Sequence, residues 1–291
     1  MTAAARYTSA MAMPAFDALP WEGAERLRFG DVAVDFCVGD ALMQRESTDD
    51  CFVLGKSPTM LARTLAELRR EPKRIVDVGV FKGGSVVLLN EVFAPDALLA
   101  LELNPLDKPP LQRYLASRGR GRVTFLRGID QANRKAVHAA CDRAFGDAPI
   151  DLVIDDASHW YPQTLATFTA LFPRLAPGGL YVIEDWGWAH WPGLHWQVEF
   201  GGAYFADKLP VSNLIVDLAL LSAALPDAFP RIAFDSVSIY VERGAGEIAR
   251  DFDVGALVHN RGQPLPRFAP GRPAQRRAFE SPEFVFRLDQ R

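Results

Sequence analysis

Residues 74–85 read RIVDVGVFKGGS, a β-branched run that passes through a glycine-rich turn into an apolar stretch. The run Arg74–Val78 is typical of a buried parallel strand, and residues 85–93 are predicted as the following helix. Gly79 and Gly83 would let the backbone of this turn approach a ligand closely. The free N–H groups at the start of the helix would face the same ligand. This stretch therefore predicts a strand–turn–helix unit with a binding site at its turn.

The same alternation continues along the chain. Further strands are predicted at residues 98–101, 123–126, 150–154 and 180–183. Helices are predicted between them at residues 111–117, 131–145 and 162–175. Strands that alternate with helices across short connections predict an α/β fold, with a doubly wound, mostly parallel sheet covered on both faces.

The two ends of the chain differ from this centre. We expect an N-terminal extension or cap, a main domain and a C-terminal tail, at residues 1–57, 58–245 and 246–291. The main domain is predicted to open with an amphipathic helix and to close with a helix and a strand pair, at residues 59–70, 211–225, 232–234 and 237–241. The proline- and arginine-rich residues 260–273 are expected to run over the surface or to contact a partner. The extension and the tail are candidate surfaces for a homo-oligomer.

Composition narrows the class of protein. Of the 291 residues, 49% are hydrophobic and 23% are charged, as in a globular protein with a sizeable core. A formal net charge of −4 argues against a nucleic-acid partner. The apolar residues 214–225 are too few to span a membrane, and the N-terminus lacks the apolar core of a signal peptide. The three cysteines lie far apart, which predicts neither disulfides nor a zinc site. We expect a cytoplasmic protein without a membrane partner.

The glycine turn favours one cofactor. Its spacing is G-x-x-x-G-G, because Phe81 stands where a dinucleotide-binding turn has its middle glycine. That pattern suits S-adenosylmethionine, whose amino-acid part carries no phosphate and whose ammonium group needs a carboxylate or carbonyls. The alternative is a tight turn without a ligand. The residues of this turn that we predict to bind the cofactor are Asp77, Gly79, Lys82, Gly83 and Ser85.

Acidic and amide residues after the next strands extend this prediction. Glu102 ends the second strand about twenty residues past the turn, where a carboxylate can accept both ribose hydroxyls. Asp130 or Gln131, after the third strand, would reach the adenine amine. Asp130 is equally suited to cap the next helix. Asp155, after the fourth strand, is predicted to face the cofactor or to support its neighbours.

Two acidic pairs follow successive strands: Asp155-Asp156 and Glu184-Asp185. Adjacent acids at strand ends repel one another unless a cation compensates them. A hard divalent ion such as Mg²⁺ prefers carboxylate oxygens, so we predict Asp156, Glu184 and Asp185 as metal ligands. The alternative is a set of ordinary strand ends with arginine partners.

His159 lies three residues after Asp156 and is the candidate general base. A neutral imidazole accepts a proton near neutral pH. Asp156 and His159 are therefore the predicted catalytic residues. His190 and His195, in a tryptophan-rich stretch, remain candidates for the acceptor pocket.

Three motifs together resemble a known family. D-x-G-x-x-x-G-G-S (77–85), D-D-x-S-H (155–159) and PGGLYVIED (177–185) are similar to the metal-dependent sugar O-methyltransferases of macrolide biosynthesis, of the mycinamicin type, with the cephalosporin hydroxylase-like proteins as a neighbouring branch. The resemblance covers roughly residues 58–186. It implies a Rossmann-like class I methyltransferase fold, Mg²⁺ on Asp156, Glu184 and Asp185, and His159 as base.

The chain departs from the family at two places. Ala157 replaces a glycine, and residues 186–192 read WGWAHWP, which leaves the methyl acceptor open. We expect a sugar or another small vicinal diol, in natural-product or polysaccharide biosynthesis. The tryptophans of this stretch, with Trp196, would stack on the acceptor or pack the loop. The alternatives are an NAD-dependent oxidoreductase, or a non-catalytic adenosylmethionine-binding or cephalosporin hydroxylase-like protein.

Overall fold

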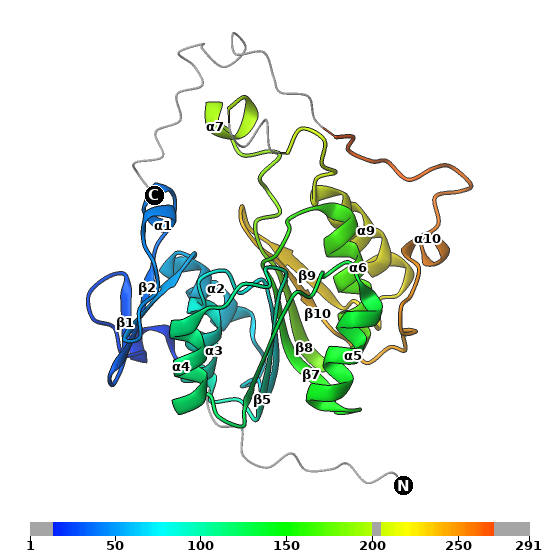
Figure 1. Cartoon of the computed structure of the whole chain (residues 1–291). Coiled ribbons are helices and arrows are strands. Elements are labelled where there is room, and N and C mark those ends of the chain that lie inside the picture. The colour runs from blue at the N-terminus through cyan, green and yellow to red at the C-terminus, as the bar shows by residue number, and fades with distance from the viewer. Residues whose placement is uncertain (1–13, 200–204, 271–291) are drawn as a thin grey trace, which may run out of the picture.

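The computed structural model describes residues 14–199 and 205–270, and its centre is a seven-stranded sheet (Figure 1). The strand order is β6-β5-β4-β7-β8-β10-β9. In chain order the strands are β4 (Arg74–Val78), β5 (Ala97–Glu102), β6 (Val123–Arg127), β7 (Ile150–Asp155), β8 (Leu175–Ile183), β9 (Arg231–Phe234) and β10 (Ile239–Glu242). The neighbouring strands β6, β5, β4, β7 and β8 run parallel to one another. Strand β10 pairs antiparallel with β8, and β9 pairs antiparallel with β10. The doubly wound, mostly parallel sheet with a terminal strand pair is confirmed.

Helices cover both faces of this sheet (Figure 1). One face carries α2 (Pro58–Glu67), α3 (Gly84–Phe93) and α4 (Pro109–Ser117), and the other carries α5 (Arg134–Phe145), α6 (Tyr161–Leu171) and α9 (Ser212–Ala224). Neighbouring strand residues point to opposite faces, so Ile75 packs with α3 while Val76 packs with α5. Each parallel strand is therefore apolar along its whole length.

Several helix boundaries differ from the prediction by one to four residues, and two of the differences have a local cause. The helix expected from residue 131 begins at Arg134, because Asn133 caps it by accepting a hydrogen bond from the Ala136 N–H at 3.1 Å. The capping role considered for Asp130 is therefore wrong. The helix expected to end at residue 175 ends at Leu171, followed by the 3-10 turn Phe172–Arg174. Pro173 has no N–H to donate, so the helix cannot continue through it.

The N-terminal segment contains regular structure that its sequence did not reveal. Strands β1 (Arg26–Phe29), β2 (Val32–Phe36) and β3 (Cys51–Leu54) form a separate sheet, with β1–β2 antiparallel and β2–β3 parallel. This sheet packs on α3 so closely that a Cβ on Gly84 would lie 2.4 Å from the Val53 carbonyl oxygen. The small sheet therefore shares the core of the main domain. The remaining short elements are the 3-10 turn Phe16–Ala18, α1 (Asp40–Gln44), α7 (Leu194–Gln197) and α10 (Val254–Leu257).

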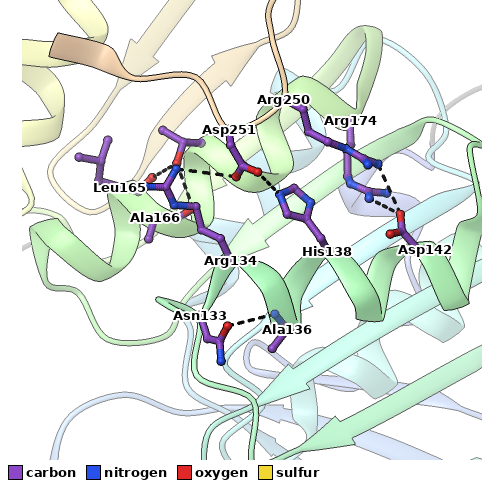
Figure 2. Close-up of polar contacts among 11 residues, drawn as sticks. Asn133, Arg134, Ala136, His138, Asp142, Leu165, Ala166, Arg174, Arg250 and Asp251 are labelled. Atoms are coloured by element: carbon purple, nitrogen blue, oxygen red, sulfur yellow. Dashed lines mark hydrogen bonds and ion pairs between the residues drawn. The ribbon is translucent and has the colours of Figure 1, made fainter. Parts of the chain in front are cut away.

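The chain after β10 is held against α5 by contacts between charged side chains (Figure 2). Asp251 contacts His138 Nε2 at 2.8 Å, while Arg250 and Arg174 both reach Asp142. These contacts hold the start of the C-terminal tail against the helix layer.

Further along, the tail crosses α9. Arg267 pairs with the fully buried Asp217 at 2.6 Å, and Phe268 exchanges two hydrogen bonds with Asn213. The described part of the proline- and arginine-rich segment thus runs over the domain surface, and residues 271–273 lie outside the described residues. Within the described ranges, no helix is long and apolar enough to cross a membrane.

The aromatic core between α6 and the sheet offers a stability test. The Phe168 ring is fully buried, 4.8 Å from the Phe172 ring and 5.0 Å from that of Tyr181. We expect Phe168→Ala to lower the free energy of unfolding by about 3–5 kcal/mol, because it leaves a cavity there. Leu106→Ala, at a side chain that is 67% exposed, is the control and should change it by less than about 0.5 kcal/mol. Urea denaturation of both variants checks this, and similar losses for the two would contradict it.

Candidate active site at the carboxyl edge of the sheet

Strand register aligns the residues that follow β4, β7 and β8. Val78 pairs with Asp155, and Asp155 pairs with Ile183. The next residues along these strands, Gly79, Asp156 and Glu184, therefore lie in one row. Backbone hydrogen bonds extend the row, since the Asp156 N–H donates to Val78 and the Glu184 N–H donates to Asp155.

Gly79 lets two of these loops touch. Its φ is +93°, and a Cβ on it would lie 2.1 Å from the Asp156 carbonyl oxygen. No other residue fits this position without moving the backbone. The glycine thus joins the turn predicted to bind the cofactor to the loop predicted to bind the metal.

A cavity of about 390 Å³ opens beside this contact. It brings together four of the nine residues that were predicted to bind the cofactor and both predicted catalytic residues, Asp156 and His159. Its polar lining includes Gly79, Glu102, Asp130, Gln131, Asp156, Ser158 and His159. Its volume and mixed apolar and polar walls are those of a small-molecule site.

Glu102 shapes the turn that it faces. Its carboxylate accepts hydrogen bonds from the N–H groups of Phe81 and Asn104, both at 2.8 Å. These bonds fix the carboxylate at the cavity wall, where its remaining lone pairs can accept ligand hydroxyls.

Asp77 and Ser85 lie beneath the turn rather than in the cavity lining. Ser85 Oγ donates to Asp77 Oδ2 at 2.7 Å, and the other carboxyl oxygen of Asp77 is buried without a hydrogen-bond partner among the described residues. Burial raises the pKa of Asp77 to about 7. Gly83, with a φ of +90°, leads from the turn into α3.

Lys82 lies apart from the large cavity. Its ammonium donates to the Leu42 carbonyl oxygen at 2.9 Å and pairs with Glu46 at 3.0 Å. It lines a second cavity of about 230 Å³ instead. The structure therefore does not bring Lys82 together with Glu102.

The first acidic pair is divided between the two sides of its strand. Asp155 is buried, where it accepts hydrogen bonds from Tyr181 Oη and Gln131 Nε2, each at 3.0 Å. Burial raises the pKa of Asp155 to about 7. Gln131 also donates to Thr167 and accepts from the Ser158 N–H, both at 2.8 Å. Asp155 and Gln131 thus support the D-D-x-S-H loop from below.

Gln131 and Asp130 differ in the hydrogen-bonding groups that remain available to an adenine ring. Both N–H groups of the Gln131 amide already have partners, so only its oxygen has spare capacity. Asp130 accepts a hydrogen bond from the Ala132 N–H at 2.8 Å and lines the cavity.

Asp156, His159 and Asp185 form a compact cluster. One ligand atom from each lies within 4.8 Å of the others. His159 Nε2 is 3.9 Å from a carboxylate oxygen of Asp156 and 3.9 Å from one of Asp185. His159 and Asp185 hold φ values of +57° and +53°, a left-handed conformation that concentrates at functional sites in non-glycine residues. Desolvation and the charge of Asp156 raise the pKa of Asp185, although His159 opposes them.

The chemistry of this cluster fits a hard divalent cation. Two carboxylates converge at the wall of the second cavity, which leaves room for a ligand beside them. A bound cation would also relieve the repulsion that raises the pKa of Asp185.

Glu184, the remaining predicted metal ligand, binds a residue that the sequence analysis missed. Its buried carboxylate accepts a hydrogen bond from the Lys56 ammonium, which also donates to Asp156 Oδ2 at 2.7 Å. Desolvation raises the pKa of Glu184 well above its usual range, although Lys56 opposes the shift. The available signal was a lysine two residues after the apolar run Cys51–Leu54, which is a strand.

The tryptophan-rich loop closes over the D-D-x-S-H loop. Trp188 Nε1 donates to the His159 carbonyl oxygen at 2.7 Å, and its ring stacks on Phe205. Trp186 and Trp191 donate to backbone carbonyls, at Asp235 and Ser236 respectively. These three tryptophans therefore pack the loop.

A third cavity, of about 150 Å³, lies behind this loop. Its lining includes Trp188, His190, Trp196, Phe205 and Phe268. His190 contacts Ser212 Oγ at 2.9 Å.

The main sheet has the doubly wound, Rossmann-like architecture typical of class I methyltransferases. Residues 53–186 match the family model described as a methyltransferase domain. This range contains the glycine turn, both acidic pairs, His159 and Lys56.

Two curated relatives and one solved structure are similar to parts of this chain. The mycinamicin VI 2''-O-methyltransferase of Micromonospora griseorubida is 31% identical over 47% of this chain and 33% of its own length. The demethylmacrocin O-methyltransferase of Streptomyces fradiae is 30% identical over 67% of this chain and 52% of its own. The chain thus spans between a third and about half the length of these two relatives. A solved MycE methyltransferase of mycinamycin biosynthesis, in complex with Mg and SAH, is 24% identical over 66% of this chain and 50% of its own, with a TM-score of 0.47.

Asp155 gives a pH test of the buried support. Its raised pKa means that the folded protein holds a proton between pH ~4 and ~7 that the unfolded chain releases. The free energy of unfolding should therefore fall as the pH rises through this window. Asp155→Asn cannot ionise and should weaken that dependence, while the other carboxyl groups with raised pKa values, Asp77, Glu184 and Asp185, maintain the rest. Urea denaturation between pH 4 and 8 measures it, with the exposed Asp96→Asn as control. An undiminished dependence in Asp155→Asn would contradict the assignment.

Proposed function

We propose that the chain is an S-adenosylmethionine-dependent O-methyltransferase, assisted by a divalent metal ion, that methylates a hydroxyl of a sugar or another small vicinal diol. The observation that most directly supports this function is that two cavities meet at His159. The 390 Å³ cavity and the 230 Å³ cavity share a wall that includes Gly79, Asp156 and His159. A reaction between two bound molecules needs this arrangement, because holding both in place removes much of its entropic barrier.

The residues of the larger cavity suit the cofactor. Glu102 would accept the ribose hydroxyls, and Asp130 would receive the adenine amine. Gly79 and Gly83 would let the methionine part lie against the turn backbone. The curated relatives that match are O-methyltransferases, and nothing in them favours the NAD-dependent alternative.

The residues around His159 suit the transfer itself. His159 would take the proton of the acceptor hydroxyl at Nε2, and the nearby carboxylates of Asp156 and Asp185 would stabilise the imidazolium that forms. The metal would be held by Asp156 and Asp185, with Glu184 as the third ligand. When bound, Mg²⁺ or a similar ion supplies Lewis acidity that makes a neighbouring hydroxyl easier to deprotonate.

A glycosylated acceptor agrees with the surroundings. One relative is named as an 8-demethyl-8-alpha-L-rhamnosyl tetracenomycin-C 2'-O-methyltransferase, 48% identical over 23% of this chain. In this chain, Trp196 and Phe268 line the third cavity, which adjoins the 390 Å³ cavity at Phe205. Residues 1–57 and 246–291 would be additions to the domain at 58–245, available for acceptor binding or assembly.

Cofactor identity is tested by isothermal titration calorimetry. S-adenosylmethionine should bind in a one-to-one ratio, with and without MgCl₂, because Glu102 and the glycine turn do not depend on the metal. NAD⁺ should give no saturable heat, since Phe81 interrupts the phosphate-binding spacing. Binding of NAD⁺ alone would overturn the proposed function.

The general base is tested by replacing His159. We expect His159→Ala to lower kcat by about 100-fold or more, because proton transfer loses its acceptor. S-adenosylmethionine binding should survive. The matched control is His259→Ala, at an exposed histidine outside the site, which should retain the wild-type rate. Methyl transfer to a glycosylated acceptor is measured against pH, and an unchanged pH–rate profile in His159→Ala would exclude this histidine as the base.

A further inference from the structure

Lys56 occupies an unusual position for a lysine. Its side chain is 7% exposed, and its ammonium donates to both Asp156 and Glu184. It comes from the link between β3 and α2, which is 100 residues from Asp156 and 128 from Glu184 in the sequence. The N-terminal segment thus contributes a side chain to the acidic site at the edge of the main sheet.

The carboxylates near Lys56 need a cation to compensate their negative charge. Asp156, Glu184 and Asp185 place three carboxylates at one edge of the sheet, and buried carboxylates are costly without compensation. Within the described ranges, the Lys56 ammonium and the His159 ring are the basic groups within 4.0 Å of these carboxylates, and the ring is charged only when it is protonated. The Lys56 ammonium donates to both Glu184 and Asp156, at 2.7 Å to Asp156 Oδ2, so these carboxylates and the ammonium compensate one another's charge.

We propose that Lys56 is a built-in counter-ion of this site, which competes with a divalent metal ion for Asp156 and Glu184 and so weakens the metal's affinity. The inference rests on the proposed metal-assisted function. Oxygens that accept hydrogen bonds from an ammonium must give them up or share them before they bind a metal. The charge of the ammonium also repels the incoming cation.

The same contact keeps the ligands in place without a metal. Glu184 is almost fully buried, and without Lys56 it would have no cation to compensate it. Lys56 thus lowers the affinity for the metal, but it also keeps the site assembled in the metal-free protein. A lysine suits this role better than an arginine, because its ammonium is a compact point charge.

The alternative explanation is that Lys56 only holds the carboxylates of Asp156 and Glu184 in place. Both roles predict that removing Lys56 destabilises the metal-free protein. Only the counter-ion predicts tighter metal binding in the variant, because a tie that merely orders the carboxylates would leave affinity equal or reduced.

The experiment titrates MgCl₂ into metal-free protein by calorimetry, at constant ionic strength and without cofactor. Lys56→Met removes the charge and the hydrogen-bond donors, while Lys56→Gln removes the charge and keeps donors. Both variants should bind Mg²⁺ at least about tenfold more tightly than the wild type, because a unit charge a few ångströms from a divalent ion interacts strongly even when screened. The control is Lys73→Met, at a half-exposed lysine paired with Glu71, and should leave the affinity unchanged.

Thermal melting gives a second measurement on the same proteins. Saturating MgCl₂ should raise the Tm of Lys56→Met and Lys56→Gln by more than that of the wild type, since stabilisation by a ligand rises with its affinity as RT ln(1 + [L]/Kd). Equal or weaker Mg²⁺ binding in both variants, with binding in the wild type intact, would overturn the counter-ion and leave the proposed function standing. Absence of Mg²⁺ binding from the wild type and both variants would overturn the counter-ion together with the metal in the proposed function.

Discussion

Gly79 and the Asp156 carbonyl group pass so close to one another that no side chain fits between them. This contact depends on register, because Val78 and Asp155 are paired partners and the chain continues from both into the same row. It puts the glycine turn, with Glu102 behind it, directly beside the loop that carries Asp156. The two cavities share this wall, so the proposed meeting of cofactor and acceptor depends on one glycine and on the pairing of two parallel strands.

The pleat of the sheet then decides what each acid does. Successive residues leave a strand on opposite sides, so Asp155 turns under the sheet to Tyr181 and Gln131 while Asp156 turns toward the cavities. One acid of the pair is a buried support that takes up a proton easily, and the other is free for a ligand. In the second pair, Glu184 is buried against Lys56 and Asp185 faces His159. Acidic pairs at strand ends thus supply both the site and the layer beneath it.

Sequence periodicity was sufficient for the main sheet and its helices, because buried parallel strands and amphipathic helices carry their burial pattern within ten or so residues. The row of Gly79, Asp156 and Glu184 followed from the rule that parallel strands end at one edge. Strands β1 to β3 escaped detection because each has four or five residues, and β2 and β3 are buried through contacts with α3. No local pattern reports such contacts.

Lys56 escaped for the same reason, at longer range. A lysine after a short apolar run is most often a solvated strand end, and only the docking of the N-terminal sheet brings its ammonium to carboxylates 100 and 128 residues away. Resemblance to a family pointed to these acids in the sequence but carried no information about what neutralises them. In a site built from three carboxylates, the compensating cation matters as much as the ligands. In the proposed metal site, a divalent ion and the lysine would be two ways of meeting one electrostatic requirement, and the free-energy difference between them would set how tightly the metal is held.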